Sequence, residues 1–161
     1  MIYAGIGARD TPKVVIGLIY LYAAAKAVDG ATLRSGGAKG ADSAFEDGAL
    51  SRLGKTEIYT VHDVTGQHKE AYRIAEECHP NWDHLTDYVR KLMVRNVFII
   101  GGKDTKTPAK YVLCWAPNGE AVGGTGHGIR VAGALGVPVH NLAEEAVFEK
   151  ARRYVNKSMG V

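Results

Sequence analysis

The chain has 161 residues, of which 46% are apolar and 23% charged, and its formal net charge is +3. Length and composition are those of one folded globular domain, which excludes a disordered or collagen-like chain. The small positive excess suits an anionic small ligand. The sequence lacks the dense run of Lys and Arg by which nucleic-acid binding is inferred from charge alone.

Short apolar runs alternate with longer segments of helical period, a pattern typical of a parallel sheet covered by helices on both faces. We therefore predict an α/β fold, a single Rossmann-like domain spanning 1–161. The predicted elements, in chain order, are a strand at 2–6, a helix at 14–28, a strand at 31–34, a helix at 41–53, a strand at 57–61, a helix at 68–78, a strand at 110–115, a helix at 126–135, a strand at 137–141 and a helix at 143–155.

The middle of the chain is harder to assign. The pair His79-Pro80 ends the helix before it. The stretch Leu85–Ile100 has helical spacing, but its end, Val97–Ile100, has the composition of a strand. Gly101–Pro108 is polar and is expected to be a surface loop.

Three segments share the order strand, glycine-rich turn, helix. They are Gly5–Arg9, Ser35–Asp42 and Gly123–Gly128. In an open parallel sheet such turns gather at the carboxyl edge of the strands, where ligands bind. Glycine lets the backbone approach a ligand, and the amino end of the following helix attracts an anion. We therefore expect a phosphate-bearing, nucleotide-like ligand at these turns. Its predicted contacts are Gly7, Arg9, Ser35, Gly36, Gly37, Gly40, Arg95, Gly123, Gly124, Thr125 and Gly126.

Two familiar phosphate motifs are absent. There is no GxxxxGK[ST], which argues against a P-loop ATPase, and no GxGxxG opens the first helix, which argues against a standard dinucleotide dehydrogenase. The six histidines show no ligand-like spacing with Cys or carboxylates, so no metal is expected, and no cofactor is predicted. With two unpaired cysteines, Cys78 and Cys114, and no run of 18 apolar residues, we expect a reduced cytoplasmic protein without membrane contact.

The second glycine turn resembles a known signature. Ser35–Asp42, followed by Ala44-Phe45-Glu46 and Ala49, is similar to the SG-A-GID-AAH-AL motif of DprA/Smf proteins, and Arg95–Gly101 resembles their RNRIISG segment. Gly123–Gly126 resembles the GGxGT turn of the LOG nucleotide hydrolases. Both groups belong to the SLOG superfamily of Rossmann-like nucleotide binders.

The whole chain also resembles the small DprA-like proteins of bacteriophages, which carry GAR-TP, HP-W and GGTG–IR–A–PV-NL in this order. The matching positions are 7–12, 79–82 and 124–142. The resemblance implies the Rossmann-like fold, nucleotide binding and pairing into a homo-oligomer. It departs from LOG enzymes at two positions. His127 stands where the motif has threonine, and Arg130 where it has the glutamate that acts on the ribose.

Asp42 and Glu46 lie four residues apart at the start of the second predicted helix, so they share one face near a glycine turn. They either hold ribose hydroxyls or act as general base, or are simply acids favoured by the helix dipole. Asp42 is the better candidate, because its position in the first turn points it toward the ligand edge. His127, at the third turn, is the other catalytic candidate, either as a hydrogen-bond donor to a phosphate or as an acid–base group, unless it is a partly exposed loop histidine.

Arginines supply the expected anion contacts. Arg9 would clamp a phosphate or pair with Asp10, and Arg34 would reach the same edge or form a salt bridge. Arg95 is expected to have a ligand or structural role, because it leads into an apolar run. Trp82 would stack on a base or be partly buried.

Three functions remain open. The first is a nucleotide-binding protein that cleaves an N-glycosidic bond, motivated by paired carboxylates beside anion-binding turns. The second is a sensor or sequestering protein for a nucleotide signal, motivated by the missing LOG glutamate. The third is DprA-like binding of single-stranded DNA, although the sequence shows no clear stripe of basic and aromatic residues for single strands.

Overall fold

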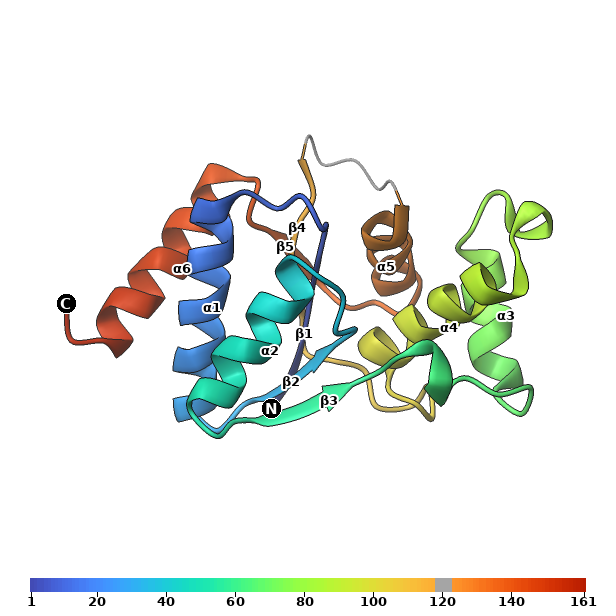
Figure 1. Ribbon diagram of the computed structural model, residues 1–161, viewed down its shortest axis with the longest axis horizontal. Coiled ribbons are helices and arrows are strands. Elements are labelled where there is room, and N and C mark those ends of the chain that lie inside the picture. Colours follow the sequence, from blue (N-terminus) through green and yellow to red (C-terminus); the bar gives the residue numbers. More distant parts are fainter. Residues whose placement is uncertain (118–122) are drawn as a thin grey trace.

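The computed structural model describes residues 1–117 and 123–161 of the chain (Figure 1). Its five strands form one parallel sheet in the order β3-β2-β1-β4-β5. The strands are β1 (Ile2–Gly7), β2 (Thr32–Ser35), β3 (Lys55–Ile58), β4 (Val112–Trp115) and β5 (Val139–Asn141). The helices are α1 (Lys13–Val28), α2 (Ala41–Ser51), α3 (Lys69–Glu77), α4 (Asp87–Gly101), α5 (Gly123–Ala134) and α6 (Glu145–Ser158).

Helices cover both faces of the sheet. Helices α1, α2 and α6 lie on one side, and α3, α4 and α5 lie on the other (Figure 1). This arrangement confirms the predicted α/β Rossmann-like fold with helices on both faces.

The core has two halves because successive side chains of a strand point to opposite faces. From β1, Tyr3 packs on the α1 side, whereas Ala4 and Ile6 pack on the α4 side. From β4, Leu113 faces α1 and Val112 faces α4. The central strands β1 and β4 are therefore mainly apolar, as expected where a sheet is buried on both faces.

The strand-like end predicted for Val97–Ile100 is wrong. These residues belong to α4, which begins after Thr86, whose hydroxyl accepts a hydrogen bond from the amide of Val89, and ends before Gly102 at φ +85°. The run is apolar on all sides because α4 is buried between the sheet and neighbouring helices. A buried helix of this kind cannot be told from a buried strand by periodicity.

The third strand also differs from the prediction of 57–61. β3 ends at Ile58, and Val61–Asp63 form a 3₁₀ turn instead. The hydroxyl of Thr60 accepts from the amide of His62, and the carboxylate of Asp63 accepts from the amide of Thr60. These local bonds compete with strand pairing and end β3 early.

Both cysteines, Cys78 and Cys114, are buried and unpaired, as predicted. Within the described part of the chain, no helix has the length and apolar character that crossing a membrane requires.

Candidate functional site

A cleft of about 350 Å³ opens at the carboxyl edge of the sheet. Here the strand order reverses, because the chain runs from β1 to β2 and β3 in one direction and then crosses to β4. Such a switch point is where ligands bind in open parallel sheets. Its lining combines the end of β1 and the start of α2 with one face of α4 and the first turn of α5. The lining residues are Ile6, Gly7, Ala8, Arg9, Ala38, Asp42, Leu92, Met93, Arg95, Asn96, Ile99, Gly123, Gly124 and Thr125.

The first two glycine turns pack against each other beside this cleft. A Cβ on Gly7 would lie 2.5 Å from the Cβ of Ala41, and one on Gly40 would lie 2.7 Å from the carbonyl oxygen of Ala8. Gly37 and Gly40 also have positive φ angles, of +69° and +90°. These glycines are therefore needed for the fold of the turns, whatever ligand the turns hold.

Asp42 is the most unusual side chain of the cleft. It is only 4% exposed, and its Oδ2 accepts a long hydrogen bond of 3.4 Å from the amide of Ala38. Its buried Oδ1 has no hydrogen-bond partner among the described residues. Burial raises the pKa of Asp42 to about 6, and the nearby guanidinium of Arg95 opposes this rise. The group therefore exchanges its proton close to neutral pH, as general acids and bases do.

Arg95 lies on α4, across Gly36 from Asp42. Its Nη1 donates to the carbonyl oxygen of Gly36 at 3.3 Å, and its buried Nε has no partner among the described residues. A Cβ on Gly36 would lie 2.9 Å from the guanidinium carbon of Arg95 and 3.0 Å from Oδ2 of Asp42. Because Gly36 has no side chain, the carboxyl group of Asp42 and the guanidinium of Arg95 can both approach the second turn closely.

The third turn contributes the amino end of α5 to the cleft. Gly123 and Gly124 are exposed, and Thr125 is half-buried. The side-chain amide of Asn96 donates to the carbonyl oxygen of Gly124 at 3.1 Å, which fixes this end of α5 against α4. The first amide groups of a helix have no partner within the helix, so they are free to bind an anion.

Of two other predicted residues, Arg9 lines the cleft and Glu46 does not. Arg9 is exposed and makes no hydrogen bond or ion pair with a described residue. Its predicted pairing with Asp10 is absent from the described ion pairs. Glu46 is half-buried one turn beyond Asp42, and its Oε1 lies 3.9 Å from the Cβ position of Gly37.

Ser35 and Gly126 do not line the cleft; they are buried beneath it. The hydroxyl of Ser35 donates to the carbonyl oxygen of Gly5 at 2.6 Å and so ties β2 to β1. Gly126 is buried in the first turn of α5.

His127 is fully buried on α5. Its Nδ1 lies 3.2 Å from the side-chain amide of Asn96, and its Nε2 lies 3.0 Å from the carbonyl oxygen of Ala75. Burial lowers the pKa of His127 to about 4, so the ring is neutral at physiological pH. This position fits neither an exposed loop histidine nor contact with a ligand, and we assign His127 a packing role between α3, α4 and α5.

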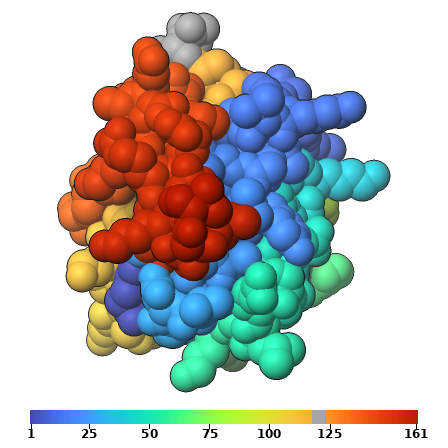
Figure 2. Space-filling model, turned by 90° about the vertical axis from the view of Figure 1, so that its left-hand side faces the viewer, coloured from blue at the N-terminus to red at the C-terminus, as the bar shows by residue number. Residues whose placement is uncertain are grey.

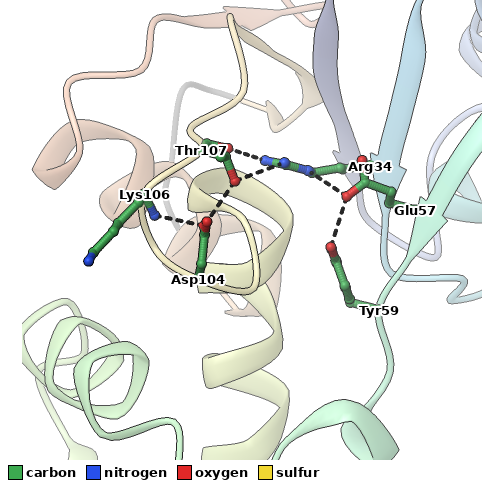
Figure 3. Close-up of polar contacts among 6 residues, drawn as sticks. All are labelled: Arg34, Glu57, Tyr59, Asp104, Lys106 and Thr107. Carbon is green, nitrogen blue, oxygen red and sulfur yellow. Dashed lines mark hydrogen bonds and ion pairs between the residues drawn. The ribbon is translucent and has the colours of Figure 1, made fainter.

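Arg34 turns away from the cleft. It is 3% exposed, its Nε lies 3.3 Å from Oε1 of Glu57, and its other nitrogens donate to Thr107 (Figure 3). Tyr59 donates to the same Glu57 oxygen at 2.9 Å, and Asp104 accepts from the hydroxyl of Thr107. Of the two roles considered for Arg34, the structure shows the salt bridge, which fastens the loop between α4 and β4 to β2 and β3.

Trp82 is 8% exposed, so it packs in the core instead of offering a free face to a base. The guanidinium of Arg90 lies 5.3 Å from its ring centre and donates to its carbonyl oxygen. Arg130, at the position where the LOG motif has glutamate, donates from Nε to the carbonyl oxygen of Cys78 at 2.7 Å.

The apolar wall of the cleft was not predicted from the sequence. Leu92 and Ile99 lie on the same face of α4 as Arg95 and Asn96, at helical spacing. The helical spacing of these four residues is present in the sequence. The face could not be recognised because 97–100 was predicted as a strand. Among the described residues, no group of three or more His, Cys, Asp or Glu side chains is placed to hold a metal ion.

Neither a family model nor a curated protein matches the sequence. Among solved structures, the chain is similar to DNA processing protein A from Helicobacter pylori, which was studied for its single-stranded DNA binding mode. The TM-score is 0.60 and the identity 20%, over 99% of this chain and 80% of that one. The likeness shows a shared fold, and it agrees with the DprA part of the resemblance seen in the sequence. It provides no support for the LOG part.

Proposed function

We propose that this protein binds single-stranded DNA and holds one nucleotide unit of the strand in the cleft at the carboxyl edge of the sheet. The observation that carries the proposal is the lining of this cleft, where Arg9, Arg95 and the amino end of α5 converge. The similarity in fold to a protein that binds single-stranded DNA supports the same assignment.

The rim of the cleft suits the phosphates of a strand. Arg9 is exposed and makes no described ion pair, so its guanidinium is available for a phosphate oxygen. Gly123 and Gly124 present the amino end of α5 without side chains that would hinder close approach. Contacts of this kind recognise the backbone and not the base sequence.

The floor of the cleft suits a base or sugar. Ionised Asp42 repels a phosphate, and its oxygens instead accept from N–H or O–H groups. Leu92 and Ile99 offer an apolar wall for the flat face of a base. We therefore orient the strand with its phosphates at Arg9 and its base toward α4.

Fluorescence anisotropy with a labelled oligothymidine, measured over a range of salt concentrations, tests the proposal. Arg9→Gln is expected to weaken binding several-fold and to reduce the slope of log affinity against log salt by about 0.7, the value for one lost phosphate contact with a single strand. The matched control is Arg153→Gln, because Arg153 is an exposed arginine on α6, away from the cleft, and like Arg9 it makes no described ion pair. Absence of binding at low salt, or equal effects of the two variants, refutes the proposal.

A free nucleotide is the second candidate ligand, and Asp42 is the observation that favours it. The cleft volume lies within the roughly 300–1,000 Å³ range of small-ligand sites. A carboxyl whose pKa is about 6 suits proton transfer during cleavage of an N-glycosidic bond, and Glu46 lies one turn away. Incubation with nucleoside monophosphates followed by chromatography for free base tests turnover, and a thermal-shift screen with the same panel tests binding alone.

One competition experiment distinguishes single-stranded DNA from a free nucleotide as the ligand. If the strand is the ligand, a mononucleotide displaces labelled oligothymidine only weakly, and no base is released. Release of base that disappears in Asp42→Asn supports the nucleotide enzyme, whereas stabilisation by a mononucleotide without turnover supports a sensor or sequestering protein.

A further inference from the structure

A second pocket, of about 260 Å³, lies on the α1 side of the sheet. It is lined by residues of α1, α6 and the β4–β5 part of the sheet, and among the described residues none lines both this pocket and the cleft at the carboxyl edge. Figure 2 shows this side of the molecule, on which α6 lies beside α1. The DNA site proposed at the cleft therefore makes no use of this pocket.

The spacing of the lining residues explains why a hollow remains here. Tyr111, just before β4, and Leu113 point to the same face of the sheet because alternate side chains of a strand do so. On α6, Val147, Ala151 and Tyr154 stand three or four positions apart and so share the face turned toward the sheet. Ala151 lies between the two larger side chains and ends at its Cβ, which leaves the space open.

Aromatic rings form the walls of the pocket. The ring centres of Tyr22 and Tyr154 lie 5.3 Å apart, and the exposed ring of His140 lies 5.7 Å from that of Tyr111. The hydroxyl groups of Tyr22 and Tyr111 bond each other, and that of Tyr154 donates to Asp29. The tyrosine hydroxyls are thus already in use, and the pocket offers mainly ring surface to a ligand.

The charged side chains that line the pocket are Lys26 and Lys150, and neither makes an ion pair with a described residue. The ammonium of Lys26 lies 4.5 Å from the ring centre of Tyr154 and 5.6 Å from that of Tyr22. Burial lowers the pKa of Lys26, and the nearby carboxylate of Asp29 opposes this change. An ammonium that has lost part of its water in this way gains from contact with an anion.

These charges decide what kind of ligand fits. A cluster of tyrosine rings without a lysine would favour a cation. Here Lys26 already lies over the rings, so a second cation would be repelled. Among the described residues, no Asp or Glu lines the pocket. The combination of ring surface with two lysines instead fits a flat ring that carries negative charge.

We propose that this pocket is a second binding site, which takes a small planar ring bearing a carboxylate or phosphate group. The ring packs against Tyr111 and Tyr154 beside the methyl group of Ala151, and the anionic group contacts Lys26 and Lys150. The volume of about 260 Å³ suits one ring with its acidic group, because it lies just below the roughly 300–1,000 Å³ of sites for drug-sized ligands. The proposal does not depend on the proposed function, since none of these residues lines the cleft.

Two-dimensional NMR of the isotope-labelled chain, titrated with phenyl phosphate as the probe, tests the site. Saturable shifts are expected at the backbone amides of Lys26, Tyr111 and Ala151, whatever happens at the amides of the cleft. Inorganic phosphate has the charge without the ring, and phenol has the ring without the charge. Each is expected to bind to this pocket at least about tenfold more weakly than phenyl phosphate. Absence of saturable shifts at the three amides overturns the proposal, as does equally tight binding of either partial probe.

Substitutions then test the two parts of the site. Lys26→Met keeps the long side chain over the rings without its charge and is expected to weaken phenyl phosphate binding about tenfold. The matched control is Lys157→Met, because Lys157 is an exposed lysine on α6 that does not line the pocket. Equal affinities of these two variants overturn the proposal.

Ala151→Leu is expected to fill the space and abolish binding of the probe. The amide spectrum of each variant checks that it is folded. If Ala151→Leu disturbs the packing of α6, the pair of lysine variants decides the question. A folded Ala151→Leu chain that binds phenyl phosphate as tightly as the wild type overturns the assigned position of the ring.

Discussion

Replacing Asp42 by Asn is expected to stabilise the protein at neutral pH. Burial raises the pKa of Asp42 from an ordinary value of 3.8 to about 6, a difference of about 2 units. At 1.36 kcal/mol per unit, ionisation of this carboxyl inside the fold costs about 3 kcal/mol. Because the folded-state pKa is the higher one, this cost is absent below pH 3.8, grows as the pH rises toward 6, and stays constant above that value.

Urea unfolding of both proteins near pH 4 and near pH 7.5 measures the effect. At the higher pH we expect Asp42→Asn to exceed the wild type by about 1–3 kcal/mol in free energy of unfolding, and near pH 4 we expect the difference to shrink toward zero. Asp104→Asn is a control of opposite sign. The amide of Lys106 and the hydroxyl of Thr107 lower the pKa of Asp104, so its loss is expected to destabilise the protein more at neutral pH than in acid.

A variant Asp42→Asn that is no more stable than the wild type near pH 7.5 would show that ionised Asp42 does not destabilise the fold. A stability difference that does not change with pH would likewise refute a raised pKa for Asp42. A positive result shows that the carboxylate is kept at a cost in stability, which is typical of residues that serve a function.

Three further predictions concern single side chains. Arg34→Met removes the guanidinium that pairs with Glu57 and donates to Thr107, and it is expected to lower the free energy of unfolding by about 1–3 kcal/mol, because Glu57 is itself partly exposed; an unchanged melting temperature contradicts this. His127→Gln removes a buried histidine that is neutral in the fold, with a pKa near 4 against an ordinary 6.5. The wild type is therefore expected to lose up to about 3 kcal/mol relative to this variant as the pH falls from 6.5 to 4, and parallel pH profiles of urea unfolding contradict this. Gly36→Ala places a Cβ 2.9 Å from the guanidinium of Arg95 and is expected to weaken oligothymidine binding several-fold, at a cost of about 1–3 kcal/mol in stability. Unchanged anisotropy titrations would refute the assigned position of Arg95.

The centre of the sheet could be predicted from the sequence because β1 and β4 are short, mainly apolar runs, whereas the edge strand β3, Lys55–Ile58, has no such run and its bounds were misplaced. The end of α4 could not be predicted, since Val97–Ile100 is buried on all sides and its pattern does not depend on whether it is helix or strand. The end of β3 was missed for a different reason. The bonds around Thr60 and Asp63 are side-chain to backbone contacts, and periodicity does not register them.

At the site, the sequence indicated which residues stand at the glycine turns, but it did not indicate which way their side chains point. Asp42 could be placed at the cleft because it opens a helix after a glycine turn. Ser35 and His127 occupy equally suggestive positions, yet their side chains point into the protein, where Gly5 and Ala75 supply their partners. Whether a polar residue at a turn faces the ligand or the core depends on tertiary packing, which a single sequence does not contain.

The buried carboxyl group of Asp42 limits which ligands the cleft could bind. Ionised Asp42 repels an anion and destabilises the fold. A cleft that bound only phosphate would therefore bind it more tightly with Arg95 alone, without a buried carboxylate beside it. Oδ1 of Asp42 and Nε of Arg95 both lack partners among the described residues, and the first accepts a hydrogen bond while the second donates one. Both atoms are enclosed by protein, so the proposed base would reach them only if neighbouring side chains moved; its edge, with a donor and an acceptor side by side, would then satisfy both. A mere anion site offers no reason to retain Asp42, whereas a site that takes a base together with its phosphate does.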